Sequence, residues 1–372
     1  MAKTNFASLM PEQKLVWAKD CWKIARNNSF INQFAGKSAN SMVHRITELK
    51  KSEKGARAMV HIVADLVGDG VTGDYMLEGN EEALFAHYQE IGMDQLRNAN
   101  RSSGRMSDQR SVIEFRETSR DKLAYWMADR MDQMAFLTLS GVPYTYTNKG
   151  ALRPVKATGQ NLSDLEFAGH VTAPTAARGL RWDATTGLMT DGNANLTTSD
   201  KISYKTLVQL KAYAKDQYIR GIRSKGNEEI YHVFVSPQGM ASLKLDADYL
   251  ANVRSAGVRG GSNPLFAGTT SVMVDGLVIH EFRHVYNTMG AASGSKWGSG
   301  GTVDGQRVLF CGAQALAMAD IGAPIWSEDK FDFDNQGGIA VGKIFGFKKP
   351  VFESPVTGNP EDFSVICLDT AI

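Results

Sequence analysis

A short run in the second half of the chain has the spacing of a zinc site. It reads His280-Glu281-Phe282-Arg283-His284 and matches the pattern H-E-x-x-H. On a helix, positions i and i+4 lie on one face, so both imidazoles can bind one zinc ion while the glutamate activates water. Residues 272–286, however, are rich in β-branched side chains and contain an Asp-Gly turn. On a strand the two histidines would lie roughly 13 Å apart, so we predict a half-exposed strand and no metal site.

A second run, Gly68-Asp69-Gly70-Val71-Thr72-Gly73, matches G-x-G-x-x-G and follows an apolar segment. Dinucleotide binding requires a helix N-terminus directly after this motif, because its N–H groups bind the pyrophosphate. Here acidic residues and Gly79 follow, which disfavour a helix start and repel phosphate. We therefore predict a glycine-shaped hairpin tip. Since the sequence shows no nucleophile elbow, Walker loop or paired-cysteine site, we expect no catalytic residues, no cofactor and no metal.

The composition is that of a soluble globular protein. Of 372 residues, 43% are hydrophobic and 22% are charged. No run of about 18 apolar residues predicts a membrane span, and the N-terminus lacks the apolar stretch of a signal peptide. The three cysteines, Cys21, Cys311 and Cys367, are far apart, which indicates free thiols in a reducing compartment. A pI of about 7.7 argues against a dedicated nucleic-acid binder.

The two motifs and the charged residues around them lie on a series of predicted segments. Residues 1–57 read as an arm with a helix from Pro11 and a second helical stretch near 38–51. Residues 58–103 read as a long hairpin, with strands over 58–67 and 88–97. Residues 107–140 read as one helix with an apolar stripe that ends at Gly141, although 112–118 could also be extended. Residues 142–199 read as a mostly surface segment that could contain short strands. The remaining predictions are helices near 204–220, 238–243 and 313–318, and strands over 231–235, 271–286, 307–310, 331–352 and 363–368.

Charge is strongly segregated near the N-terminus. Residues 1–57 carry eleven Lys and Arg against four Asp and Glu, a net +7. Residues 58–94 carry eight acids and no Lys or Arg, a net −8, in a chain whose total is +1. Opposite blocks this close favour contacts across a subunit boundary. A long hairpin is also unstable alone, so it needs a neighbouring surface. The sequence therefore predicts a protein that binds copies of itself.

The order of these segments resembles that of the major capsid proteins of tailed double-stranded DNA bacteriophages, which have the Hong Kong 97-type fold. The resemblance is strongest to the podovirus family related to the Escherichia N-four phage. It is specific over 65–141 and looser after residue 200. The segments that carry it are Leu66-Val-Gly-Asp-Gly-Val-Thr-Gly-Asp, Leu77-Glu-Gly-Asn-Glu-Glu-Ala-Leu, Met93-Asp-Gln-Leu-Arg, Trp126-Met-Ala-Asp-Arg-Met-Asp-Gln, Leu139-Ser-Gly, Val235-Ser-Pro and Val274-Asp-Gly-Leu-Val-Ile-His-Glu.

The resemblance implies an α+β fold of four parts. Residues 1–57 would form the N-terminal arm and 58–104 the extended loop. The peripheral domain would comprise 105–199 and 327–372, with a spine helix over 107–140 and a surface insertion over 142–199. Residues 200–326 would form the axial domain.

The function implied is self-assembly, in the bacterial host cytoplasm, into the hexamers and pentamers of an icosahedral virion head around double-stranded DNA. Further candidate partners are scaffolding, portal and cement proteins. Contact with the packaged DNA would be weak and non-specific, because the chain is nearly neutral, and no membrane partner is expected.

In this interpretation the loop acids contact basic side chains of a neighbouring subunit, either in its arm or at the start of its spine helix. The loop acids are Asp69, Asp74, Glu78, Glu81 and Glu82. The candidate basic partners at the spine are Arg97, Arg101, Arg105, Arg110, Arg116 and Arg120. Some shells of this fold are locked by isopeptide bonds through a loop lysine. No lysine lies between Ala58 and Gly104, so we expect no such cross-link.

Two other functions remain open at this point. One is a zinc metalloenzyme that uses His280, Glu281 and His284. The other is an encapsulin-like compartment with the same fold, which would enclose enzymes instead of DNA.

Overall fold

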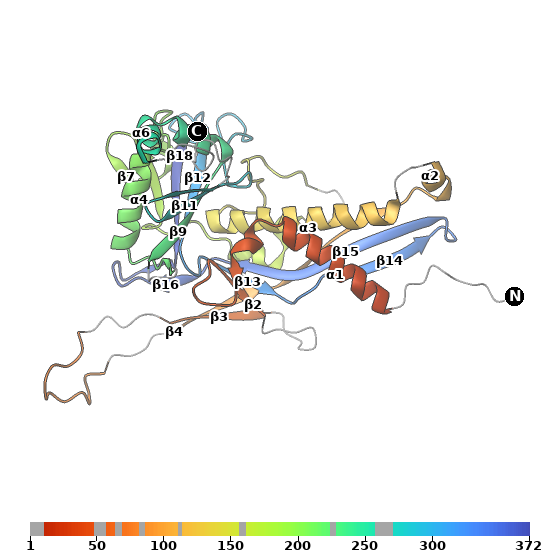
Figure 1. The fold of residues 1–372 in the computed structure, drawn as a ribbon, viewed down its shortest axis with the longest axis horizontal. Coiled ribbons are helices and arrows are strands. Elements are labelled where there is room, and N and C mark those ends of the chain that lie inside the picture. The colour runs from red at the N-terminus through yellow and green to blue at the C-terminus, as the bar shows by residue number, and fades with distance from the viewer. Residues whose placement is uncertain are drawn as a thin grey trace.

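The computed structural model describes residues 11–47, 57–63, 69–81, 86–110, 114–155, 161–223, 228–256 and 271–372. The molecule is elongated (Figure 1). A long sheet with one long helix along it leads to a compact part built around a second sheet, and residues 69–81 lie well apart from both. The helices are α1 (Pro11–Asn28), α2 (Arg105–Arg110), α3 (Phe115–Ser140), α4 (Tyr204–Asp216), α5 (Pro237–Leu245) and α6 (Ala247–Ala256), with short 3-10 turns η1 (Ile31–Phe34), η2 (Leu162–Asp164), η3 (Glu166–His170) and η4 (Asn193–Asn195).

The spine helix α3 buries one apolar stripe. Leu123, Met127, Met131 and Met134 recur at helical spacing and are at most 2% exposed. The helix ends as predicted at Gly141, whose φ of 66° lies in the left-handed region and whose N–H donates to Thr138 O. The prediction of one helix over 107–140 is wrong at its start, because Glu114 is extended and α3 begins at Phe115.

The long sheet has six strands in the order β1-β2-β13-β15-β14, and β5 also pairs with β15. Because β13 and β14 pair with successive parts of the 13-residue β15, they share one of its edges and β5 takes the other. The strands are β1 (Ala35–Gly36), β2 (Val43–Ile46), β5 (Asp94–Arg101), β13 (Leu316–Asp320), β14 (Ile325–Phe331) and β15 (Gln336–Lys348).

This sheet corrects two helix predictions. A second helical stretch was expected near 38–51, yet β2 is a strand that runs parallel to both β1 and β13, and residues 48–51 lie outside the described residues. Residues 313–318 were also expected to be helical, yet β13 pairs with β2 and β15. In both segments, pairing with distant strands outweighs local helix propensity. The arm therefore supplies part of the long sheet.

The compact part contains an eight-stranded sheet in the order β10-β11-β9-β12-β18-β6-β7, with β8 paired to β9. Helices α4 and α5 begin at caps that the sequence provides, since Ser203 and Ser236 accept hydrogen bonds from Thr206 N and Gly239 N. The strands are β6 (Gly179–Asp183), β7 (Gly187–Met189), β8 (Ile222–Arg223), β9 (Glu229–Val235), β10 (Ser271–Val274), β11 (Leu277–Glu281), β12 (Gly305–Cys311) and β18 (Val365–Ala371).

Two sequence predictions are corrected by this second sheet. The C-terminal β18 lies in the compact part beside β12, whereas 327–372 was expected to return to the peripheral domain. The described part of 142–199 is mostly exposed or half-buried, as predicted, but it is fixed to the body of the subunit, because β6 pairs with β18 and Tyr144, Phe167 and Trp182 are buried. The strand expected over 271–286 is a hairpin of β10 and β11 that ends at Glu281.

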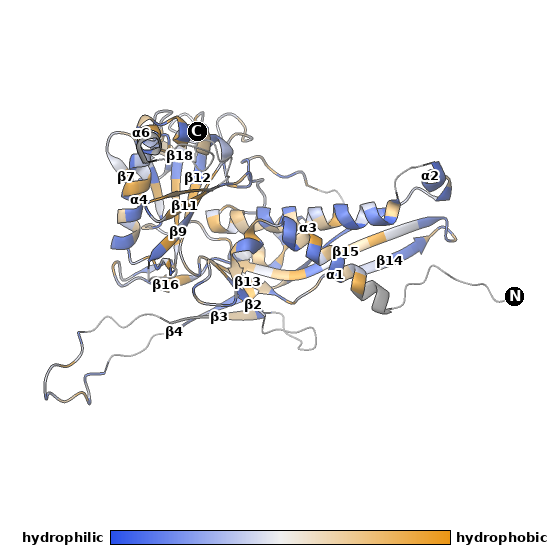
Figure 2. Cartoon of the chain, viewed as in Figure 1, coloured by the Kyte–Doolittle hydropathy of each residue, from blue (hydrophilic) through white to orange (hydrophobic). Residues whose placement is uncertain are grey.

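Two small hairpins complete the fold. One consists of β3 (Arg57–Val63) and β4 (Ala86–Gly92), and the other of β16 (Val351–Glu353) and β17 (Pro360–Asp362). Residues 64–67 of the strand predicted over 58–67 lie outside the described residues. One core joins α1, α3 and the long sheet, and a second fills the compact part. Figure 2 shows hydrophobic residues along β15 and the strands of the compact part, and a hydrophilic α2.

Candidate assembly interfaces

The base of the loop hairpin is fixed to the long sheet. Ala58 and Val60 pack with Ile91 and Met93 against β13. Gly92 N donates to the His170 ring at 3.1 Å, and the Lys348 ammonium donates to Glu90 O at 2.9 Å. These contacts fix the direction in which the loop leaves the body of the subunit.

The tip of the loop, in contrast, lies free of its own subunit. Residues 69–81 project away from the rest of the chain (Figure 1) and contain no helix, in agreement with the predicted hairpin tip. Asp69, Asp74, Glu78 and Glu81 are exposed there, and Glu82 lies outside the described residues. Between the acids, Tyr75, Met76 and Leu77 are 80%, 72% and 60% exposed. An acidic tip with an exposed apolar centre is suited to bind another molecule.

The predicted basic partners divide into two groups. Arg116 pairs with Glu328 at 3.0 Å and Arg120 with Asp121 at 2.8 Å, and both guanidinium groups lie over the ring of Trp17. Their contacts therefore hold helix α1 against α3. Arg101 stacks on Phe331, with 4.2 Å between its guanidinium carbon and the ring centroid. Arg101 nevertheless stays exposed, as do Arg97, Arg105 and Arg110. Within one subunit, the structure brings none of the six beside the described loop acids.

The arm is anchored to the spine helix by one buried carboxylate. Asp132 accepts hydrogen bonds from the Ser29 hydroxyl at 2.7 Å, from Phe30 N at 2.8 Å and from Ile31 N at 3.1 Å. Burial raises the pKa of Asp132, and these three donors oppose the rise. Phe30 also stacks on Phe282, with 4.1 Å between ring centroids. No sequence motif indicated this anchor.

A groove runs between α3, β5, residues 147–154, residues 161–165 and residues 282–290, with a volume of about 1580 Å³. Arg130 and Arg153 lie on its wall and donate to the same oxygen, Gln133 Oε1, at 2.6 and 3.1 Å. Burial, and then the charge of Arg130, lower the pKa of Arg153. The sequence carries no signal for this pair, because nothing in the local sequence brings residues 130 and 153 together.

His280 and Glu281 of the H-E-x-x-H run lie on a strand, as predicted, whereas Phe282, Arg283 and His284 lie beyond its end in a turn, and no part of the run is helical. His280 is on β11, where its Nε2 lies 3.0 Å from Nδ1 of His232 on β9. Burial lowers the pKa of both imidazoles to about 4. His284 instead contacts Asp129 at 2.8 Å. The two histidines of the motif therefore belong to different clusters, and no group of three or more metal-binding side chains is found among the described residues.

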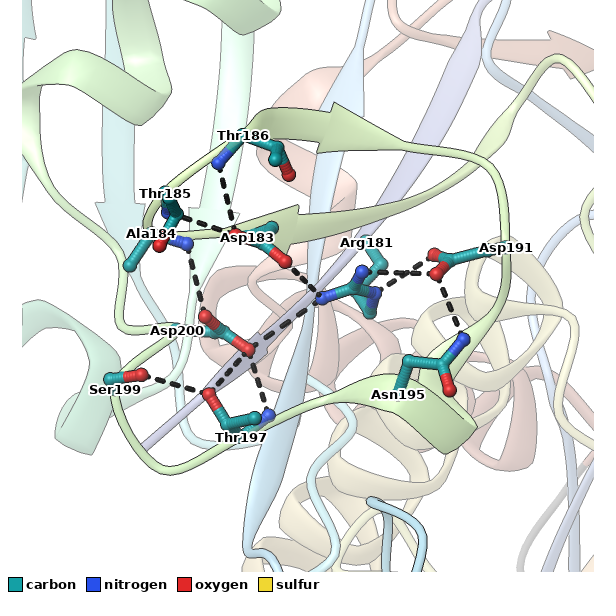
Figure 3. A network of polar contacts seen from close by, with 10 residues as sticks. All are labelled: Arg181, Asp183, Ala184, Thr185, Thr186, Asp191, Asn195, Thr197, Ser199 and Asp200. Carbon is teal, nitrogen blue, oxygen red and sulfur yellow. Dashed lines mark hydrogen bonds and ion pairs between the residues drawn. The ribbon is translucent and has the colours of Figure 1, made fainter.

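A network in the compact part holds the segment 183–200 (Figure 3). The buried guanidinium of Arg181 pairs with Asp191 at 2.9 Å, Asp183 at 3.2 Å and Asp200 at 3.6 Å. Hydrogen bonds from Thr186 N and Thr185 N lower the pKa of Asp183 to about 2, and Arg181 does the same for Asp191. The cation that these carboxylates surround is the guanidinium itself, so the network is structural.

The fold places the chain among viral shell subunits of the Hong Kong 97 type. The capsid structure of Ralstonia phage GP4 is 28% identical, with a TM-score of 0.73 over 92% of this chain and 90% of that one. The capsid structure of cyanophage Pam1 is 17% identical, with a TM-score of 0.71 over 100% and 96%. The second likeness establishes the fold alone.

Sequence comparison gives the family. A model described as "Phage capsid protein" matches residues 5–372. The major capsid protein of Pseudomonas phage KPP25 is 58% identical over 366 residues, which cover 98% of this chain and 96% of that protein. The chain belongs to the phage capsid protein family and functions as a bacteriophage major capsid protein, a structural component of the virion. Neither the metalloenzyme nor the encapsulin alternative gains support. No helix among the described residues is long and apolar enough to span a membrane.

Proposed function

We propose that this chain assembles into the hexamers and pentamers of an icosahedral head that encloses double-stranded DNA. The observation that carries the proposal is the contrast within the loop hairpin. Its base is fixed to the long sheet, whereas its acidic tip projects without support from its own subunit. Such a tip gains ordered contacts only from another molecule. Many weak identical contacts around a closed shell are sufficient for a stable assembly.

The parts of the fold take distinct roles in this proposal. The arm comprises residues 1–57. The extended loop comprises residues 58–104, and its last strand, β5, joins the long sheet. The peripheral domain is the long sheet with α3, and the axial domain is the compact part, which includes β6, β7 and β18. The exposed Arg97, Arg101, Arg105 and Arg110 remain candidate contacts for a neighbour's loop. Each exposed ion pair contributes about 0–1 kcal/mol, so these pairs set orientation more than stability.

Further elements of the proposal follow from the sequence segments given above. The chain is related to podovirus capsid proteins of the kind found in the Escherichia N-four phage, it assembles in the bacterial host cytoplasm, and it catalyses no reaction. Scaffolding, portal and cement proteins are its candidate partners, and it contacts packaged DNA weakly and without sequence preference.

Microscopy of particles from infected cells, combined with nuclease treatment, tests the proposal. We expect icosahedral heads in which this chain is the main protein and in which double-stranded DNA survives nuclease. Particles that contain enzymes instead of DNA would support the encapsulin alternative, and a chain found only as soluble monomers would exclude both shells.

A further inference from the structure

Helix α1 carries a row of cations on the face that it turns away from the subunit. This cation row consists of Lys19, Lys23 and Arg26, at positions i, i+4 and i+7, which lie on one side of a helix. All three residues are exposed. Among the ion pairs between described residues, none includes a member of the row. The arm therefore presents positive charge that its own subunit does not neutralise.

The rest of α1 holds the cation row in place. The helix packs on α3 and β14, and Trp22 and Ala25 on its opposite face are buried. Hydrogen bonding to Asp121 raises the pKa of Arg120 on α3, and the charge of the exposed Asp20 adds to this rise. Asp20 thus lies close enough to α3 to act on its arginine, which leaves the cation row with a surface of its own.

The other residues on this face favour one kind of partner. Beside the cations lie Asn27 and Asn28, and the exposed large apolar side chain among the described ones of α1 is Val16, near the start of the helix. A neighbour's loop tip would leave its exposed apolar run Tyr75–Leu77 without apolar contacts on such a face. A phosphate backbone needs only cations and polar donors, so the face suits a nucleic acid better.

We propose that the cation row faces the interior of the shell and binds phosphates of the packaged double-stranded DNA. Along the helix axis the three cations are spaced about 6 Å and about 4.5 Å apart. DNA carries one phosphate per about 1.7 Å of its axis, so each cation reaches a phosphate in many orientations and without sequence preference. The whole chain has a net charge of only +1, but its basic residues are concentrated in the arm. The inference rests on the proposed head and names the surface that meets the genome.

Amine labelling tests the contact without any substitution. DNA-filled heads, and heads from the same preparation emptied by osmotic shock and nuclease, are acetylated with a small succinimidyl ester. Mass spectrometry then gives the modified fraction of each lysine. We expect Lys19 and Lys23 to be modified at least about fivefold less in filled heads than in emptied ones, because bound phosphate shields the amines.

Two results of the labelling would reject the inference. High modification of both lysines in both kinds of head would show that DNA does not cover the row. Low modification in both would show that protein covers it, in favour of a protein partner.

Charge reversal tests the same contact through DNA retention. The variant is Lys19→Glu, Lys23→Glu, Arg26→Glu, and the matched control, at three exposed lysines of the compact part, is Lys201→Glu, Lys205→Glu, Lys215→Glu. Reversing the row should lower the fraction of shells that retain DNA at least about threefold, because the reversed face repels phosphate. The control should leave this fraction near that of the unaltered chain.

Circular dichroism of the unassembled subunits shows whether each variant folds. Failure of the unaltered chain to form shells would reject the proposed head itself. An unchanged fraction of filled shells in the folded row variant would reject only the contact with DNA. An equal loss in both variants would also reject it, since total charge and not the row would then set DNA retention.

Discussion

Ser29 in the arm donates a hydrogen bond of 2.7 Å to Asp132 in the spine helix, across 103 positions of sequence. The backbone amides of Phe30 and Ile31 donate to the same carboxylate. Because Asp132 is only 3% exposed, water replaces none of these contacts. The relationship adds a buried polar anchor to the apolar side chains through which the arm packs on the core of the subunit.

Removing this carboxylate should loosen the arm. In Asp132→Ala, three donors lose their acceptor, so we expect the free energy of unfolding to fall by about 3 kcal/mol. Denaturant titration of the unassembled subunit measures this change, and limited proteolysis should show faster cleavage near Ser29. Asp132→Asn keeps one acceptor oxygen and should lose less. Equal stability of Asp132→Ala and the unaltered chain would contradict the anchor.

A second anchor joins β2, β13 and β15 through Asp320. Its buried carboxylate pairs with Lys343 at 2.5 Å and with Arg45, and the Lys343 ammonium lies 3.7 Å from the centroid of the Trp22 ring. In Asp320→Ala two cations lose their counter-charge, so we expect a loss of about 3–5 kcal/mol in unfolding free energy.

The exposed pair Lys330–Asp334 is the matched control for Asp320. Asp334→Ala should cost no more than about 0.5 kcal/mol, because solvent screens that pair. Similar losses in the Asp320 and Asp334 variants, measured by denaturant titration, would show that burial of the first pair is unimportant.

Acid should weaken the contact between the arm and the compact part. His232 and His280 have a pKa of about 4 in the folded chain, below the ordinary value near 6.5. The unfolded chain therefore binds protons first as the pH falls, so the pair's contribution to stability is complete above pH 6.5 and is lost as the pH falls to about 4. Unfolding free energies measured between pH 7 and pH 4 should decline.

The double variant His232→Phe, His280→Phe is the control for the pH effect. It removes both titrating groups from a cluster that already contains Phe34 and Phe234, and its pH dependence should be flatter. An equally steep decline in this variant would assign the effect to other groups.

The loop should join subunits without covalent bonds. No lysine lies between Ala58 and Gly104, so an isopeptide bond cannot begin from a loop amine. Assembled particles boiled in SDS should therefore run as a single band near 40.6 kDa. A ladder of covalent multimers whose linkage maps to this loop would refute the expectation.

Local signals in the sequence predicted the elements that local chemistry determines. Pro11 marks the start of α1, Gly141 ends α3, and Ser236-Pro237 starts α5. The sequence was misleading where a distant partner decides the structure. Leu316–Asp320 is rich in helix-forming residues, but β2 from the arm and β15 from the tail make it a strand.

The candidate sites divide in the same way. The acidic loop was visible as a run of charge, so its exposed tip was predicted. The sequence did not predict which arginines are free to bind this tip. Arg116 and Arg120 are not free, because both are engaged with Trp17 of the arm. The arginine pair in the groove depends on how residues 147–153 lie against α3, which no spacing in the sequence encodes.

Electron cryomicroscopy of particles formed by the unaltered chain tests the central claim most directly. The account predicts closed icosahedral shells of hexamers and pentamers, in which residues 69–81 of each subunit lie on a neighbouring subunit. A uniformly monomeric sample, or shells in which every loop tip contacts only its own subunit, would contradict it.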